Sequence, residues 1–150
     1  MKKILPVLAL LIAVYAYQTF GHLEQSPRAT NSASHSAANV SNAHIDDAFR
    51  NRRSNIQVRG SGTVVKVLAD DREGSLHQRF IVRLSSERTV LIAHNIDLAP
   101  RIENVRAGDP IEFSGEYEWN ERGGVVHWTH DDPKRQHEAG WIRFHGQLYQ

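Results

Sequence analysis

The sequence predicts an all-β fold, a small five-stranded barrel, for the C-terminal two thirds of the chain. Three observations lead to this expectation. Apolar and polar residues alternate with a period of two in several short segments, which is typical of half-buried strands. Turn-forming residues separate these segments, and glycines stand inside the first of them, where a strand has to bend. The chain of 150 residues contains no cysteine, so core packing rather than disulfide bonds must hold the domain together.

The N-terminal segment is typical of an exported protein. Lys2 and Lys3 precede a short apolar run, as in a secretory signal peptide that is cleaved after Ala16. The alternative is an uncleaved membrane anchor over residues 4–20, which is at the short limit for a membrane span. Residues 1–20 are therefore interpreted as a signal peptide or an anchor. The domain is expected to be periplasmic or secreted, or else anchored in the inner membrane and exposed to the periplasm, with no other membrane contact.

Two elements are expected between this segment and the barrel. Residues 21–43 are rich in Ser, Asn and Ala and lack apolar periodicity, which predicts a disordered linker. Residues 44–55 are expected to form a short helix, because Ile45 and Ala48 recur at helical spacing. The chain thus enters the barrel domain through a helix.

The barrel domain is expected over residues 56–150. Its first strand is long and carries Gly60 and Gly62, which permit a bend or a bulge. Two strands then form a hairpin, a connection follows, and a final hairpin turns at Asn120–Gly124, where glycine takes a positive φ without strain. This order matches a Greek-key barrel of the OB type, with an open antiparallel sheet as the competing fold. The expected strands cover residues 57–68, 79–84, 89–93, 111–119 and 125–129.

The alternation within the final hairpin also predicts its register. Across its two strands, Tyr117 is expected to face Val126, and Glu116 is expected to face His127 on the opposite side of the sheet. Gly115 is expected to face Trp128, because a glycine leaves room for the indole. A slip of one residue would break these pairs. The expected core is Val64, Val67, Phe80, Val82, Leu84, Val90, Ile92, Ile111, Phe113, Tyr117, Val126 and Trp128.

The charge of the barrel domain argues against nucleic acid as its partner. Residues 56–150 hold 12 Lys and Arg residues against 14 Asp and Glu residues, so this part is slightly acidic when its histidines are neutral. A nucleic-acid groove is usually clearly basic, because phosphate contacts dominate the affinity. An oligonucleotide-binding barrel therefore stays only as an alternative.

Histidines and carboxylates in the second half of the chain are candidate ligands for a divalent metal such as zinc. Imidazole nitrogens and a carboxylate oxygen, with one position left open, suit a transition metal. The alternative interpretation is that these side chains are hydrogen-bonded surface or hairpin residues. A histidine–aspartate pair could also act as a general base, whereas no serine or cysteine stands in a nucleophile motif. The candidate ligands are His94, Asp97, His127, His130, Asp131 and His137.

A second set of residues is a candidate binding surface, because these polar or aromatic side chains lie at expected strand ends or in loops. No catalytic residue can be assigned from the sequence. We expect a non-enzymatic binding module for an unknown envelope ligand, peptide or glycan. The alternative is a metal-dependent hydrolase, such as a phosphodiesterase or nuclease, that uses the His/Asp cluster. The candidate surface residues are His77, Arg79, Asn95, Trp119 and Trp141.

Five motifs stand out in the barrel domain: Gly62–Val65, His77–Phe80, Ala93–Pro100, Gly115–Asn120, and His127–His130 followed by Trp141. Together they resemble a family of small exported bacterial proteins that is catalogued as a domain of unknown function. The resemblance covers about residues 56–150. It implies an envelope protein of Gram-negative bacteria and supplies no activity.

A weaker resemblance links the first strand to the thermonuclease version of the OB barrel. Gly62–Val67 followed by Asp70 and Asp71 is similar to the opening strand and acidic turn of that family. The resemblance implies carboxylates that bind calcium and arginines that stabilise a phosphoryl transition state, one of them Arg79 or Arg83. The second arginine and the catalytic glutamate have no match, and Arg101 stands where the glutamate is expected.

Overall fold

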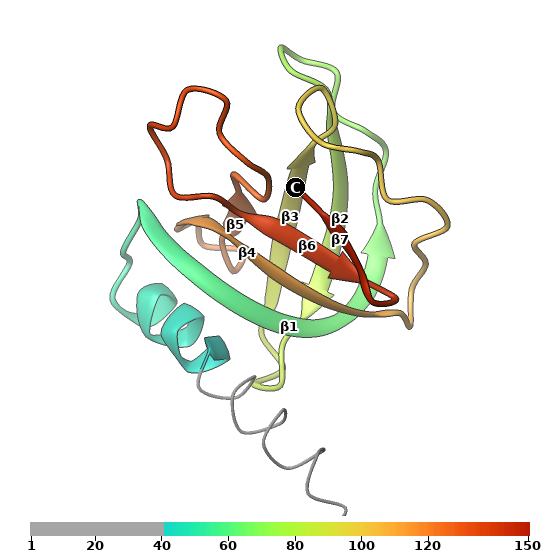
Figure 1. Cartoon of the computed structure of the whole chain (residues 1–150). Helices are drawn as coiled ribbons and strands as arrows, with labels where there is room; N and C mark the ends of the chain where they lie inside the picture. Colours follow the sequence, from blue (N-terminus) through green and yellow to red (C-terminus); the bar gives the residue numbers. More distant parts are fainter. Residues whose placement is uncertain (1–40) are drawn as a thin grey trace, which may run out of the picture. The chain divides into compact units, whose positions relative to one another are not determined.

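The computed structural model describes residues 41–150 of the chain (Figure 1). The expected signal or anchor segment at residues 1–20 and nearly all of the expected linker at residues 21–43 lie outside the described residues. Within residues 41–150, no helix is long and apolar enough to cross a membrane. This part of the chain holds a helix at residues 41–50 and seven strands.

Five strands close into the barrel. Neighbouring strands follow the order β1-β2-β3-β5-β4, and β1 also pairs with β4, which closes the sheet. β3 and β5 run parallel, whereas the other neighbours in the barrel are antiparallel. This connectivity is that of a five-stranded OB-like Greek-key barrel, so the expected fold class is confirmed. The strands are β1 (Ile56–Val67), β2 (His77–Arg83), β3 (Thr89–Asn95), β4 (Pro110–Glu118) and β5 (Val125–His127).

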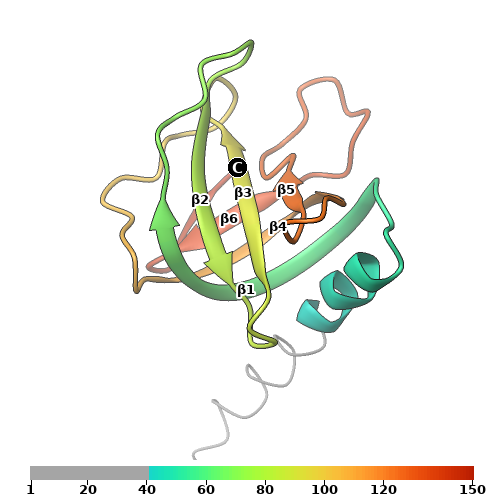
Figure 2. The ribbon, with the colours of Figure 1, turned by 180° about the vertical axis from the view of Figure 1, so that it is seen from behind.

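Two short strands that the sequence did not predict extend the sheet. β6 (Trp141–Phe144) pairs with the first half of β4, beside β5, and β7 (Gln147–Tyr149) pairs with β6. Ile142 and Phe144 of β6 are buried in the core. Figures 1 and 2 show β2 and β3 as one wall of the barrel and β4 with β6 as the opposite wall.

The long first strand pairs with strands of both walls because it bends. Residues Ile56–Thr63 of β1 pair with β4, and residues Thr63–Val67 pair with β2, with a register shift between Val64 and Lys66. Gly62 lies at the bend, where an added Cβ would come within 2.2 Å of the Arg83 carbonyl oxygen. The expected glycine bend therefore has a steric cause, since any side chain at this position would separate β1 from β2.

The core of the barrel agrees with the alternation of the sequence, with two exceptions. Ten of the twelve expected core residues are buried. Val67 is wrong, because it lies at the end of β1 and is 39% exposed. Trp128 is also wrong: β5 ends at His127, the Trp128 backbone turns to a φ of 50°, and its side chain is only half-buried.

The helix packs against the barrel next to the first half of β1 (Figures 1 and 2). Ile45 and Ala48 are fully buried within the core cluster. Trp119 donates from Nε1 to the Phe49 carbonyl oxygen over 3.1 Å. Residues 41–43, which were expected in the linker, are helical. The helix ends at residue 50 rather than at the expected residue 55, because Arg52 adopts a φ of 51° and the chain turns away.

Candidate metal centre

The register of the final hairpin brings two glutamates and a histidine to one face. Glu116 pairs with His127 and Tyr117 pairs with Val126, as expected, and Glu118 pairs with Val125. The expected pair of Gly115 and Trp128 does not form, because β5 ends at His127. Tyr117 points into the barrel and is fully buried, so its neighbours Glu116 and Glu118 both point outward. His127 points to this same outer face, since it lies directly opposite Glu116.

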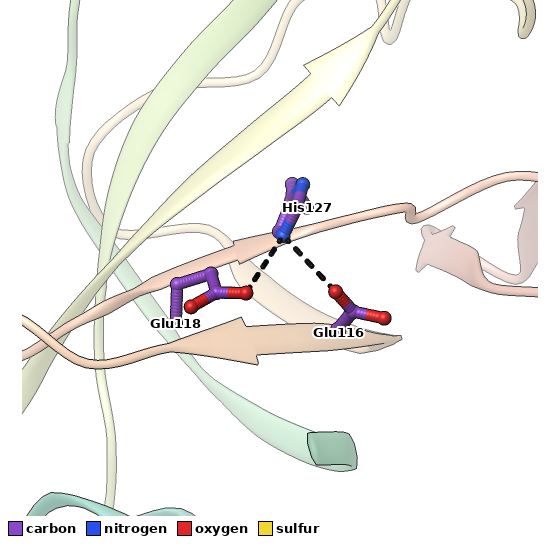
Figure 3. A group of neighbouring side chains, drawn as sticks. All are labelled: Glu116, Glu118 and His127. Carbon is purple, nitrogen blue, oxygen red and sulfur yellow. Dashed lines mark ion pairs between the residues drawn. The ribbon is translucent and has the colours of Figure 1, made fainter. Parts of the chain in front are cut away.

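The three side chains converge on one point (Figure 3). His127 Nε2 lies 3.7 Å from Glu116 Oε1 and 3.9 Å from Glu118 Oε1. One ligand atom from each residue lies within 4.8 Å of the other two. These distances are too long for hydrogen bonds. They suit ligands that share one ion, because ligand atoms that are each about 2.1 Å from a metal lie roughly 3 to 4 Å apart.

His127 Nε2 is the unusual atom of this cluster. It is the one side-chain polar atom among residues 41–150 that is buried without a hydrogen-bond partner. A buried polar atom without a partner costs free energy, which predicts that a ligand compensates for it. Its position between two carboxylates makes it a candidate ligand for a cation.

Burial keeps His127 in the form that binds metals. Burial lowers the pKa of His127 below its usual value, although the nearby carboxylates of Glu116 and Glu118 act to raise it. A neutral imidazole is the metal-binding form of histidine. The two glutamates thus face a neutral ring. Their negative charges lack a cationic neighbour within this trio of Glu116, Glu118 and His127.

Residues 29–150 match the family described as "Protein of unknown function (DUF3465)". The chain belongs to this family. The expected membership of a family of unknown function is therefore confirmed, and the match extends to the N-terminal side of the barrel. No curated protein gives a significant match to this member of the family.

In this DUF3465 protein, His137 lies beside the trio. Its Nδ1 is 3.4 Å from Glu116 Oε2. Its ring stacks on Trp128, with centroids 3.9 Å apart and an interplanar angle of 15°. Asp132 accepts hydrogen bonds from the backbone N–H of Lys134, Gln136 and His137, and these bonds shape the loop that carries His137.

The other four expected ligands do not lie in the cluster. His94 is fully buried, and its two ring nitrogens contact Thr129 Oγ1 at 2.9 Å and the Pro100 carbonyl oxygen at 3.2 Å. Burial lowers the pKa of His94 to about 4, so this ring is neutral. His130 is buried, and its Nδ1 contacts the Asp131 carbonyl oxygen at 2.7 Å. The remaining two are exposed: Asp131, and Asp97, which accepts a hydrogen bond from Leu76 N.

The expected binding-surface residues are also dispersed. Trp119 contacts the helix, and Arg79 donates to the Ala69 carbonyl oxygen. His77 Nδ1 contacts the Ser75 carbonyl oxygen, and Asn95 Oδ1 accepts from Asp97 N. Trp141 is half-buried on β6, with the Arg143 guanidinium 5.0 Å from its ring centroid. Most of these polar groups therefore satisfy local backbone atoms.

Glu116 and Glu118 were not among the ligands expected from the sequence. The signal that could have found them is present, because the predicted register already placed Glu116 opposite His127. Residues two apart on a strand share a face, so Glu118 follows from the same pattern.

Proposed function

We propose that this protein is a non-enzymatic binding module of the bacterial cell envelope and that its ligand is a divalent transition-metal ion. The observation that carries the proposal is the buried, unpartnered His127 Nε2 between the carboxylates of Glu116 and Glu118. The location in the envelope rests on the export features of residues 1–20.

The ligand set favours transition metals over calcium and magnesium. One imidazole nitrogen with two carboxylate oxygens suits Zn²⁺, Mn²⁺ or Co²⁺, whereas Ca²⁺ and Mg²⁺ take oxygen ligands. The two glutamates are 20% and 36% exposed, so the site opens to solvent through their carboxylates, although His127 Nε2 itself is buried. Water can therefore complete the coordination, and the ion can exchange.

The charge of the metal-free site supports a cation rather than an anion or a nucleic acid. Glu116 and Glu118 point outward from the same strand, and the ring between them is neutral. A divalent ion would compensate both carboxylates. A phosphate backbone would instead meet two negative charges on this face.

A calcium-dependent nuclease finds little support at the acidic turn that resembles the thermonuclease family. Asp70 accepts two hydrogen bonds from Arg101, at 2.7 and 3.2 Å. Asp71 lies 3.6 Å from Arg79 and accepts a hydrogen bond from Glu73 N. Both carboxylates are thus paired with arginines, which leaves them poorly suited to bind calcium.

Metal titration of the purified protein, stripped with a chelator, tests the proposal. Isothermal titration calorimetry with Zn²⁺ is expected to show one ion per chain, with Mg²⁺ and Ca²⁺ binding far more weakly. At a zinc concentration of 100 Kd, the free energy of unfolding should rise by about 2.7 kcal/mol. The variants Glu118→Gln and His127→Ala should lose both effects.

Two matched controls separate this site from nonspecific binding. Glu121→Gln removes an exposed glutamate of the adjacent turn, and His44→Ala removes an exposed histidine of the helix. Both should bind zinc as the wild type does. A wild type that neither binds zinc nor gains stability would overturn the proposal. Zinc-dependent cleavage of bis(p-nitrophenyl) phosphate that is lost in Glu118→Gln would replace the non-enzymatic module with the hydrolase.

A further inference from the structure

The segment between β5 and β6 returns to the metal-binding trio. Residues 128–140 leave β5 at Trp128, which has a φ of 50°, and reach β6 at Trp141. Gly140 N donates to the His130 carbonyl oxygen over 3.0 Å, which closes the base of this loop. An added Cβ at Gly140 would come within 1.9 Å of the Trp128 carbonyl oxygen, so the two ends of the loop are tightly packed.

His137 lies in this loop and is held by three contacts. Its ring stacks on Trp128, and its backbone N–H donates to Asp132 Oδ2 over 3.0 Å. Its Nδ1 faces Glu116 Oε2 at 3.4 Å. The side chain is one-third exposed, so it lies at the edge of the site rather than in the core.

Glu116 divides its two carboxylate oxygens between two imidazoles. Oε1 faces His127 Nε2 within the trio, and Oε2 faces His137 Nδ1 outside it. A metal-binding carboxylate is commonly fixed in this way, because a hydrogen bond to the second oxygen orients the first one toward the ion. His137 N–H is suitably placed for this task, and His137 is not one of the three residues whose ligand atoms lie within 4.8 Å of one another.

We propose that His137 is a positioning residue of the metal site: its Nδ1–H donates to Glu116 Oε2 and holds Glu116 Oε1 toward the ion, while Trp128 holds the His137 ring. The inference rests on the proposed metal-binding function and assigns a role to the loop between β5 and β6. Metal affinity then depends on a residue that does not touch the metal.

Cobalt titration of the full protein tests this role, because Co²⁺ gives visible absorption bands that report its ligands. His137→Leu removes both the ring and the donor. His137→Asn removes the ring but keeps an N–H donor near the position of Nδ1. His137→Leu should weaken cobalt binding by about 10- to 100-fold with unchanged band positions, and His137→Asn should recover most of the loss. Trp128→Leu should weaken binding in the same direction.

Each outcome separates the positioning role from its competitors. Equal affinity of His137→Leu and the wild type, or equal losses in His137→Leu and His137→Asn, would overturn the role while the metal site stands. Shifted absorption bands in His137→Leu would show that His137 is itself a ligand, which also overturns the role. Absence of cobalt binding by the wild type would instead overturn the metal site. His44→Leu, at an exposed helix position, is the matched control and should change nothing.

Discussion

Acidification should destabilise this protein through the buried histidine His94. His94 is fully buried between Thr129 and Pro100, and its pKa falls to about 4 from a usual value of 6.5. Below pH 6.5 the unfolded chain binds a proton at this position that the folded chain does not bind. The free energy of unfolding therefore falls as the pH falls, and this loss is complete once the pH is below the pKa of His94 in the folded state.

The size of this effect follows from the two pKa values. Their difference of about 2.5 units corresponds to about 3.4 kcal/mol at full protonation. The loss relative to pH 7.5 should reach about 2 kcal/mol at pH 5 and about 3 kcal/mol at pH 4. Such a loss is a large part of the stability of a small domain.

Urea unfolding of the metal-free protein, followed by circular dichroism at a series of pH values, measures this loss. The comparison is His94→Gln, which does not titrate and keeps an amide donor for the Pro100 carbonyl oxygen. Other groups titrate in both proteins, so the difference in slope isolates His94. If wild type and His94→Gln lost the same free energy between pH 7 and pH 4, burial of a neutral His94 would be refuted.

Three further predictions concern packing and the metal site. Gly124→Ala should destabilise the fold by more than about 2 kcal/mol, because the added Cβ would meet the Tyr117 ring at 2.2 Å and the φ is 94°. Gly74→Ala, with open space around it, should cost about 1 kcal/mol. Thermal melts of the two glycine variants measure this difference. Ile45→Ala should cost about 2 to 5 kcal/mol in urea unfolding by separating the helix from the barrel; a loss below about 1 kcal/mol would contradict this packing. Metal-free Glu118→Gln should be at least as stable as the wild type although it no longer binds zinc, since it relieves repulsion from Glu116; clear destabilisation would contradict that view.

Local patterns predicted much of the candidate site. Alternation placed Glu116 and Tyr117 on opposite faces of β4, and the hairpin turn set Glu116 opposite His127. Both are short-range properties, because a strand has a period of two and a tight turn determines which residues pair. The pairing at the centre of the site therefore follows from local sequence alone.

The burial and hydrogen bonding of His94 and His130 depended on contacts between distant segments. His94 and His130 have the same side chain as His127, yet both are buried, and His94 contacts Thr129, which lies 35 positions away. No local pattern distinguishes a histidine whose buried ring nitrogens have hydrogen-bond partners from a histidine with a buried nitrogen that has none. The short strand β6 was missed for a related reason, since four residues become a strand only when β4 lies beside them.

The sequence by itself determined the five strands of the barrel, most of the alternating core and the central pairs of the β4–β5 hairpin, because these follow from the period of a strand and the chemistry of turns. Tertiary structure alone decided that His127, among the histidines that the structure describes, keeps a buried nitrogen without a hydrogen-bond partner. Tertiary structure also decided where the Trp128 side chain lies, since the chain leaves β5 with a positive φ. It likewise placed His137 beside Glu116 and stacked its ring on Trp128. The physical reason is that burial and hydrogen bonding of a side chain depend on the neighbours that the whole fold supplies.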